Sequence, residues 1–266
     1  MPVKSVSLKN PVDYCGFQWT VKATRNNDAS KKPLDQFTGL VETSIGAFRI
    51  PQFAGKIFKS ATEVARLSGG STSTVQSMGS ISSTLGGIAN ATSFAACFVA
   101  VPAAGKSIVG LAHGRVTGTK VLDSINKTAD ATAYLAYATL LFTSNEPVKV
   151  VGDIASVVAD GTGVIQKARD LHQAINIKAS LAGKKCTNIK KSLGEYIKLK
   201  WIELSKEITA LATGVLGLLG LMLGGLIVPA IVLLTISLAS TVLAITSHFF
   251  KANMDRKVTF TQEAIA

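Results

Sequence analysis

The chain has 266 residues, of which 47% are hydrophobic and only 17% are charged, yet its formal net charge is +12. A chain that is both basic and apolar is typical of proteins that contact anionic lipid headgroups. Aromatic residues make up only 6% and Lys outnumbers Arg, so the stacking surfaces and arginine clusters of nucleic-acid-binding proteins are not expected.

The N-terminal segment is predicted to be a loose polar arm. Its first residues lack an apolar stretch, so a cleavable secretory signal is not expected. Residues 1–34 are polar and contain turn-forming stretches, which favour irregular structure. The pattern from Phe17 to Val21 predicts a short strand within this arm.

Residues 35–165 are predicted to form a region of apolar and amphipathic helices. Apolar residues recur at helical spacing from Asp35 to Pro51, where the proline is expected to interrupt the helix, and the pattern then continues to Ala65. We expect these two short helices to pack on other helices, and a position in a membrane interface is the alternative. The Ser-, Thr- and Gly-rich residues 68–83 indicate either a flexible connector or a closely packed helix of small residues.

Three later segments of this region are less polar. Leu85 to Gly105 is apolar enough to be a third membrane-span candidate, but its polar residues favour a buried helix. Thr128 to Asn145 has the half-polar character of a core helix. For Val148 to Asp160 the periodicity does not distinguish a helix from a short strand.

Residues 166–207 are predicted to form a basic amphipathic helix. Between Lys167 and Glu207 there are ten Lys or Arg residues and four acids, and apolar residues recur at intervals of three, four or seven. Lysines and an amphipathic indole beside an apolar segment favour the headgroup layer of a membrane. The residues predicted to contact headgroups, here and just after the next segment, are Lys184, Lys185, Lys190, Lys191, Lys198, Lys200, Trp201, Lys206 and Lys251.

Residues 208–250 contain no charged side chain and are predicted to form a transmembrane helical hairpin. About 20 apolar residues cross the hydrocarbon core of a bilayer, which fits one limb from Ile208 to Leu226 and a second from Ala230 to Phe250. Both ends of the hairpin are basic, so both are expected on the same side of the membrane. Residues 251–266 would form a short basic tail. A buried hairpin within a soluble helical protein is the alternative.

Small residues recur along the first limb at three- and four-residue steps. In lipid, such residues let two helix backbones approach closely, so we expect them to seat the first limb against the second. Self-association between chains through the same surface is the alternative. The residues assigned to hairpin packing and to its turn are Gly214, Gly217, Gly220, Gly224, Gly225 and Pro229.

No set of residues indicates catalysis, a metal or a cofactor. Ala100 to Ser107 ends like a phosphate-binding loop, but Ala100 replaces the first glycine and Pro102 removes a backbone donor, so a simple connecting loop is expected. The three histidines are far apart and lack metal-site spacing. The three cysteines are widely spaced and odd in number, so they indicate neither a disulfide framework nor a metal site.

The paired apolar limbs from Ile208 to Phe250, divided by Gly224, Gly225 and Pro229, resemble the bilobed hydrophobic domain of chlamydial inclusion-membrane proteins. The resemblance is one of topology and covers under a fifth of the chain. It implies export by type III secretion, insertion into the host inclusion membrane with both termini in the host cytosol, and a role as a scaffold or tether for host factors. Here the limbs lie near the C-terminus, so the recruiting surface would be residues 1 to about 205.

From these features we expect an all-α, membrane-associated protein with a C-terminal transmembrane helical hairpin and no enzymatic activity. It is predicted to act as a secreted scaffold or tether, with membrane lipids and anionic headgroups as partners, protein partners bound through residues 35–165, homo-oligomers as a further possibility, and no nucleic acid. A pore-forming or translocator-type protein, in which a soluble bundle shelters the hairpin before insertion, is the alternative.

Overall fold

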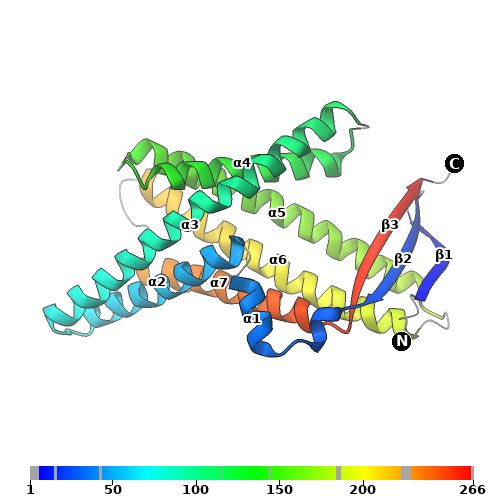
Figure 1. The fold of residues 1–266 in the computed structure, drawn as a ribbon, viewed down its shortest axis with the longest axis horizontal. Coiled ribbons are helices and arrows are strands. Elements are labelled where there is room, and N and C mark those ends of the chain that lie inside the picture. The colour runs from blue at the N-terminus through cyan, green and yellow to red at the C-terminus, as the bar shows by residue number, and fades with distance from the viewer. Residues whose placement is uncertain are drawn as a thin grey trace.

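A computed structural model describes residues 6–14, 17–41, 44–114, 116–143, 145–183, 187–222 and 229–264, most of which are helical (Figure 1). In chain order the elements are β1 (Val6–Tyr14), β2 (Phe17–Arg25), a short 3-10 helix η1 (Asn27–Ser30), α1 (Pro33–Val41), α2 (Ser44–Leu67), α3 (Thr72–Ala112), α4 (Gly118–Thr139), α5 (Glu146–Ser180), α6 (Thr187–Met222), α7 (Ala230–Asn253) and β3 (Arg256–Ala264).

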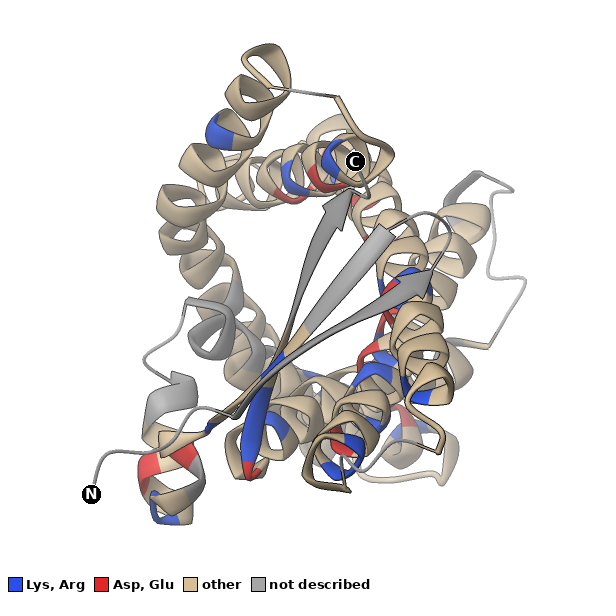
Figure 2. Cartoon of the chain, turned by 90° about the vertical axis from the view of Figure 1, so that its right-hand side faces the viewer, with Lys and Arg blue, Asp and Glu red and all other residues tan. Residues whose placement is uncertain are grey.

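The six long helices pack in a closed cycle. Each helix from α3 to α7 packs on the one before it, and α7 returns to pack on α2. Figure 1 shows the C-terminal ends of α2, α4 and α6 at one end of the molecule and the sheet at the other. Figure 2, seen from the right-hand side of Figure 1, shows the helices end-on as a ring. The chain therefore has two ends of different character, a turn end and a sheet end.

The sheet joins the beginning and the end of the described chain. Its order is β1-β2-β3 and both pairings are antiparallel, with Val21 opposite Phe260 in the second. Side chains alternate between the two faces of a strand, and in β2 Val21 and Ala23 are buried while Lys22 is exposed. The prediction of a strand from Phe17 to Val21 is confirmed.

The N-terminal arm, which was predicted to be loose, is regular in the residues described, and the predicted short basic tail includes a strand. Residues 6–14, 17–25 and 256–264 form strands, and residues 27–30 a 3-10 helix. β1 pairs with β2 and β2 with β3. The all-α prediction therefore holds for the bulk of the chain but omits the sheet. The missing information was non-local, because β3 is stabilised by a strand more than two hundred positions away.

Large aliphatic side chains form a core where the sheet meets the α5–α6 hairpin. Burying each such side chain contributes about 1.5–3 kcal/mol, so this end has the packing of an ordinary water-soluble domain. The buried members are Val21, Ala23, Ala174, Ile177, Leu181, Ile189 and Leu193, with Tyr196, Ile197 and Val258 packed at the edge.

Helix boundaries differ from the predicted ones at two places. Pro51 lies inside α2, which continues through it to Leu67, so the predicted interruption is wrong. Residues 72–83 belong to α3 and form a helix of small residues, the second of the two alternatives. Ser71 begins this helix by accepting a hydrogen bond from the Thr74 amide at 3.3 Å. Residues 148–160 are helical, within α5.

Two side-chain amides hold the C-terminal end of α7 to the N-terminal part of the chain. The Asn26 side chain donates to the carbonyls of Lys251 at 3.0 Å and Ala252 at 3.2 Å. Gln36 and Asn253 exchange hydrogen bonds between their amides, both at 3.0 Å. The Asn26 bonds satisfy carbonyls that a helix end leaves without partners, and both pairs of bonds hold the end of α7 to residues 26–36.

Replacing Asn26, which is 2% exposed, by Ala is expected to destabilise the fold by about 1–3 kcal/mol, because the two carbonyls at the end of α7 lose their buried donor. Denaturant unfolding of the purified protein, followed by circular dichroism, measures the change. Asn27→Ala is the matched control, since Asn27 is exposed. Equal stability of the two variants would show that the Asn26 bonds do not hold α7.

Candidate membrane-facing surface

Side-chain size is distributed unusually across the helices of the turn end. Buried apolar side chains on α3, α4 and the first half of α5 are small, mainly alanines. Large apolar side chains on the same helices and on the turn after α4 point outward, and among the most exposed are Phe98 of α3 at 70% and Phe142 of that turn at 78%. Further exposed members are Phe94, Val99, Val101, Ile108, Val109, Leu135, Leu141, Val151, Ile154 and Val158.

This distribution is the reverse of the one expected in water. Soluble proteins bury Ile, Leu and Phe, and they seldom expose large contiguous apolar patches. In lipid, large apolar side chains gain nothing by turning inward, and helices associate through small residues that let their backbones approach. The inverted packing of α3, α4 and α5 therefore matches the packing expected of helices in hydrocarbon.

Two of the described helices are long and apolar enough to cross a membrane. They are α3 and residues 231–253 of α7, and only 17% of the most apolar window in each is buried. With a rise of about 1.5 Å per residue, α7 spans about 35 Å, close to the thickness of a hydrocarbon core. The 41 residues of α3 exceed that length, so only part of α3 would lie in the core. A buried helix was predicted for Leu85 to Gly105, and its exposure contradicts that prediction.

Hydroxyl groups of α7 are satisfied without water. Thr235 donates to the Ile231 carbonyl at 2.7 Å and Ser247 to the Ala244 carbonyl at 2.8 Å. Ser240 reaches across to the Lys206 carbonyl of α6 at 3.3 Å. Such bonds remove the cost of placing hydroxyl groups in hydrocarbon. These three hydroxyl groups of α7 therefore have the hydrogen-bond acceptors that a membrane-spanning helix requires.

A lysine from α2 contacts α7 between its two ends. The Lys56 ammonium donates to the Thr241 hydroxyl at 3.0 Å and to the Ser237 carbonyl at 3.4 Å. Thr241 has no exposed surface and Ser240 is 5% exposed. The face of α7 that carries these hydroxyl groups is therefore seated against α2 and α6, and the opposite face is outward.

The first predicted limb is the distal half of a longer helix. Residues 208–222 continue α6 directly from its basic part, and among the described residues this helix is not one of the two span-length helices. Gly224 and Gly225 lie outside the described residues. Pro229 is exposed and immediately precedes α7.

The glycine prediction is wrong about the partner helix. A Cβ on Gly214 would lie 2.7 Å from a methyl carbon of Val157, which belongs to α5. Gly214 thus lets α6 approach α5 and not the second limb. A Cβ on Gly217 would meet nothing within 4 Å, so this glycine faces open space.

Some of the lysines predicted to contact headgroups are exposed, and others are partly or fully buried in ion pairs with acidic residues. Lys198, Lys251 and Trp201 are exposed, and Trp201 has 53% of its surface accessible. Lys191 is exposed and lies 3.6 Å from Asp255. Lys190 is half-buried, and Lys184 and Lys185 lie outside the described residues.

Two of the predicted headgroup lysines are held by acids within the helical cycle. Lys206 lies 2.5 Å from Glu207 and its side chain is only 20% exposed. The Lys200 side chain is 11% exposed and lies 3.0 Å from both Asp170 and Glu203. These contacts correct the prediction for both residues, because their charges are already balanced inside the protein.

The Lys200 cluster, formed by Lys200 and Glu203 of α6 with Lys167 and Asp170 of α5, joins the two helices. Glu203 also lies 3.2 Å from Lys167 of α5, and the Lys200 ammonium sits 5.2 Å from the centre of the Tyr196 ring. Burial alone would raise the pKa of Glu203, but the charges of Lys200 and Lys167 outweigh it, so the pKa lies below the usual value of a glutamate. Burial by itself would lower the pKa of Lys200. The nearby Glu203, Tyr196 and Asp170 outweigh this effect and raise the pKa of Lys200 above its usual value.

The residues that resemble a phosphate-binding loop form no loop. Residues 100–107 lie inside α3, so their amides are committed to helical hydrogen bonds. The expected connecting loop is also wrong. Within the described residues there is no group of three or more His, Cys, Asp or Glu placed to hold a metal ion.

No protein-family model, curated protein or solved structure matches this chain.

The outward residues of α3, Phe94 and Phe98 above all, were not predicted as part of a membrane-facing surface. A signal for them is present in the sequence, because the apolar residues of α3 are spread around the helix and leave no polar face. A helix of that kind is either deeply buried or in a membrane.

Gly214→Leu is expected to separate α6 from α5 and to lower the stability of the fold by roughly 1–3 kcal/mol, because overpacking forces both backbones apart. Gly217→Leu is the matched control and should be neutral or stabilising, since that position is open and Leu favours helix. Thermal unfolding of both variants in the same detergent measures the difference. Equal losses would contradict the close approach at Gly214.

Glu203→Gln is expected to make the free energy of unfolding less dependent on pH between pH 7 and pH 3. A carboxylate with a lowered pKa contributes stability above its unfolded value of about 4.3, and that contribution is lost as the pH falls through the folded pKa. Unfolding free energies at pH 7 and pH 3 should therefore differ less in the variant than in the wild type. Glu63→Gln, on α2 and away from the cluster, should retain the wild-type difference.

Proposed function

We propose that this chain is a membrane-anchored protein without enzymatic activity, held in lipid by its apolar helices and presenting its sheet end to water as a scaffold or tether. The observation that supports the proposal most strongly is the inverted side-chain size on α3, α4 and α5. Small residues occupy the helix contacts while Phe, Leu, Ile and Val face outward, and hydrocarbon is the surrounding in which that arrangement is stable.

The distribution of charge supports an orientation. Lys190, Lys191 and Lys198 lie on the part of α6 near the sheet and Lys251 ends α7 beside it, whereas residues 208–222 and 230–250 are uncharged. In this proposal the sheet end lies on the side that is not translocated and its exposed lysines meet anionic headgroups.

A protein partner would bind at the sheet end. Of the predicted partner region, residues 35–165, much of α3 and α4 would be covered by lipid, and α1 remains on the water side. Leu34 and Phe37 on α1 are 73% and 42% exposed, which suits contact with another protein. By the resemblance to chlamydial inclusion-membrane proteins, the membrane would be an inclusion membrane reached by type III secretion and the partner a host factor.

A pore-forming protein is the second candidate, since α7 contacts both α6 and α2 within the helical cycle. Shelter before insertion requires the apolar helices to be covered, and both span-length helices are mostly exposed. Anchorage is the simpler function for such a surface.

Membrane retention and vesicle leakage distinguish the candidates. We expect the protein to remain in the pellet after alkaline carbonate extraction of membranes and to leave dye-loaded anionic vesicles intact. Dye release from a soluble form of the protein would support the pore-forming candidate. Recovery in the supernatant without leakage would contradict both.

A lysine introduced on the outward face of α7 tests whether that face is surrounded by lipid or by water. Val242 is 45% exposed, so Val242→Lys costs almost nothing if that face is in water, but about 2.5–3.5 kcal/mol if it lies at mid-membrane. We expect lower recovery of this variant in the carbonate pellet. Ile175→Lys, at a 43% exposed site on α5 near the sheet, is the matched control and should behave as the wild type.

A further inference from the structure

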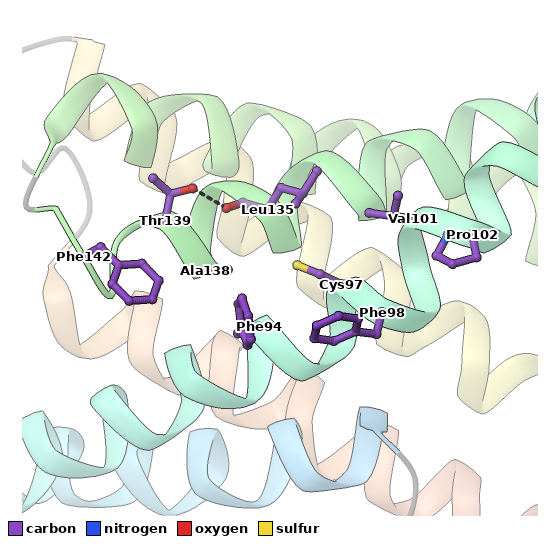
Figure 3. A pocket seen from close by; sticks show the side chains of 9 residues that line it. All are labelled: Phe94, Cys97, Phe98, Val101, Pro102, Leu135, Ala138, Thr139 and Phe142. Carbon is purple, nitrogen blue, oxygen red and sulfur yellow. Dashed lines mark hydrogen bonds between the residues drawn. The ribbon is translucent and has the colours of Figure 1, made fainter.

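An apolar groove runs between the second half of α3 and the C-terminal half of α4. Its volume is about 460 Å³, within the range of about 300–1,000 Å³ found for small-molecule sites. Figure 3 shows side chains of the two helices on either side of it. The lining residues are Phe94, Cys97, Phe98, Val101 and Pro102 of α3, and Leu135, Ala138, Thr139 and Phe142 of α4 and the turn that follows it.

The lining of the groove is almost entirely apolar. None of its lining side chains is charged. The Thr139 hydroxyl donates to the Leu135 carbonyl at 2.8 Å, a bond drawn in Figure 3, and the Cys97 thiol donates to the Ser93 carbonyl at 3.3 Å. A polar ligand would therefore lose its hydrogen bonds with water and find no side-chain donor in return.

Two aromatic rings shape one wall. The Phe94 and Phe98 rings meet edge to face, with their centroids 5.4 Å apart and their planes at 90°. This is a favourable geometry for an aromatic pair. Phe98 and Phe142 keep most of their surface exposed, so the groove is open along one side.

The size and position of the groove indicate a flexible hydrocarbon chain and not a protein segment. A stable protein interface buries about 800 Å² on each partner, far more than a groove of this volume supplies. The open side also continues into the outward face of α3, where Val99 is 60% exposed. On that face the molecule already turns large apolar side chains outward.

We propose that the α3–α4 groove, defined by the nine lining residues, binds one acyl chain of a membrane lipid. The inference rests on the proposed anchorage in a membrane, and it adds a defined site to a surface that otherwise meets lipid without specificity. The bound chain fills the space between two helices whose buried apolar side chains are small, and so stabilises their spacing.

Native mass spectrometry of the full chain, purified in detergent and titrated with dioleoylphosphatidylcholine, tests the site. We expect a saturable adduct of one lipid per chain. Thr139→Phe places a ring in the groove from an exposed position and should lower occupancy at least tenfold. Phe98→Ala removes part of the wall and provides a second variant if Thr139→Phe fails to fold.

Thr235→Phe is the matched control. Thr235 is an exposed threonine of α7 with the same hydroxyl-to-carbonyl bond one turn back, but it is not one of the nine residues that line the α3–α4 groove. It should bind lipid as the wild type does. Equal occupancy in Thr139→Phe, Phe98→Ala and Thr235→Phe, or graded binding of many lipids without a one-to-one species, would overturn the site.

The two proposals fail in different ways. A wild-type protein that stays in the carbonate pellet but forms no one-to-one lipid adduct refutes the groove site and leaves anchorage intact. A wild-type protein that is extracted by carbonate refutes anchorage, whatever it binds in detergent. A lipid-free dimer in light scattering that Thr139→Phe dissociates would assign the groove to a second copy of the chain and overturn the acyl-chain proposal.

Discussion

Close approach of helices through small side chains is the constraint on which the turn end of this protein depends. Alanines and one serine, Ser124, occupy the buried positions of α4, and glycines or alanines occupy those on the first two-thirds of α5. A Cβ on Gly152 would lie 3.1 Å from Ala136 and from the ring of Tyr137. Such contacts leave no space for large residues between the helices, so those residues must face outward. The outward apolar surface is a consequence of how the helices pack.

The sheet end follows the opposite rule, and the two ends meet along α5 and α6. Near the sheet, Ile177, Ile189 and Leu193 are almost completely buried, as in a water-soluble domain. The Lys200 cluster lies along the same helices, where buried charges are stable only because each has a partner. Beyond Glu207 the charges on α6 stop. A boundary between water and lipid near this level of the molecule would suit both halves.

The sequence predicted the features that depend on local composition. The uncharged run from Ile208 to Phe250 is helical in its described parts, and α7 has the length of a span. Non-local features were missed. Lys200 appeared to be a headgroup contact because its partner Asp170 lies on another helix, and Gly214 was assigned to the wrong neighbour because no local pattern reveals that Val157 faces it. β3 was missed for the same reason, since its pairing strand is at the other end of the chain.

The central claim is that hydrocarbon surrounds the outward face of α7. A nitroxide attached at Val242→Cys, in a protein otherwise free of cysteine and reconstituted in vesicles, reports this directly through its collisions with oxygen, which concentrates in lipid, and with a water-soluble nickel chelate. We predict that oxygen dominates at position 242 and that the nickel chelate dominates at Ile175→Cys near the sheet. Dominant collision with nickel at position 242, or protection from both reagents, would contradict the account.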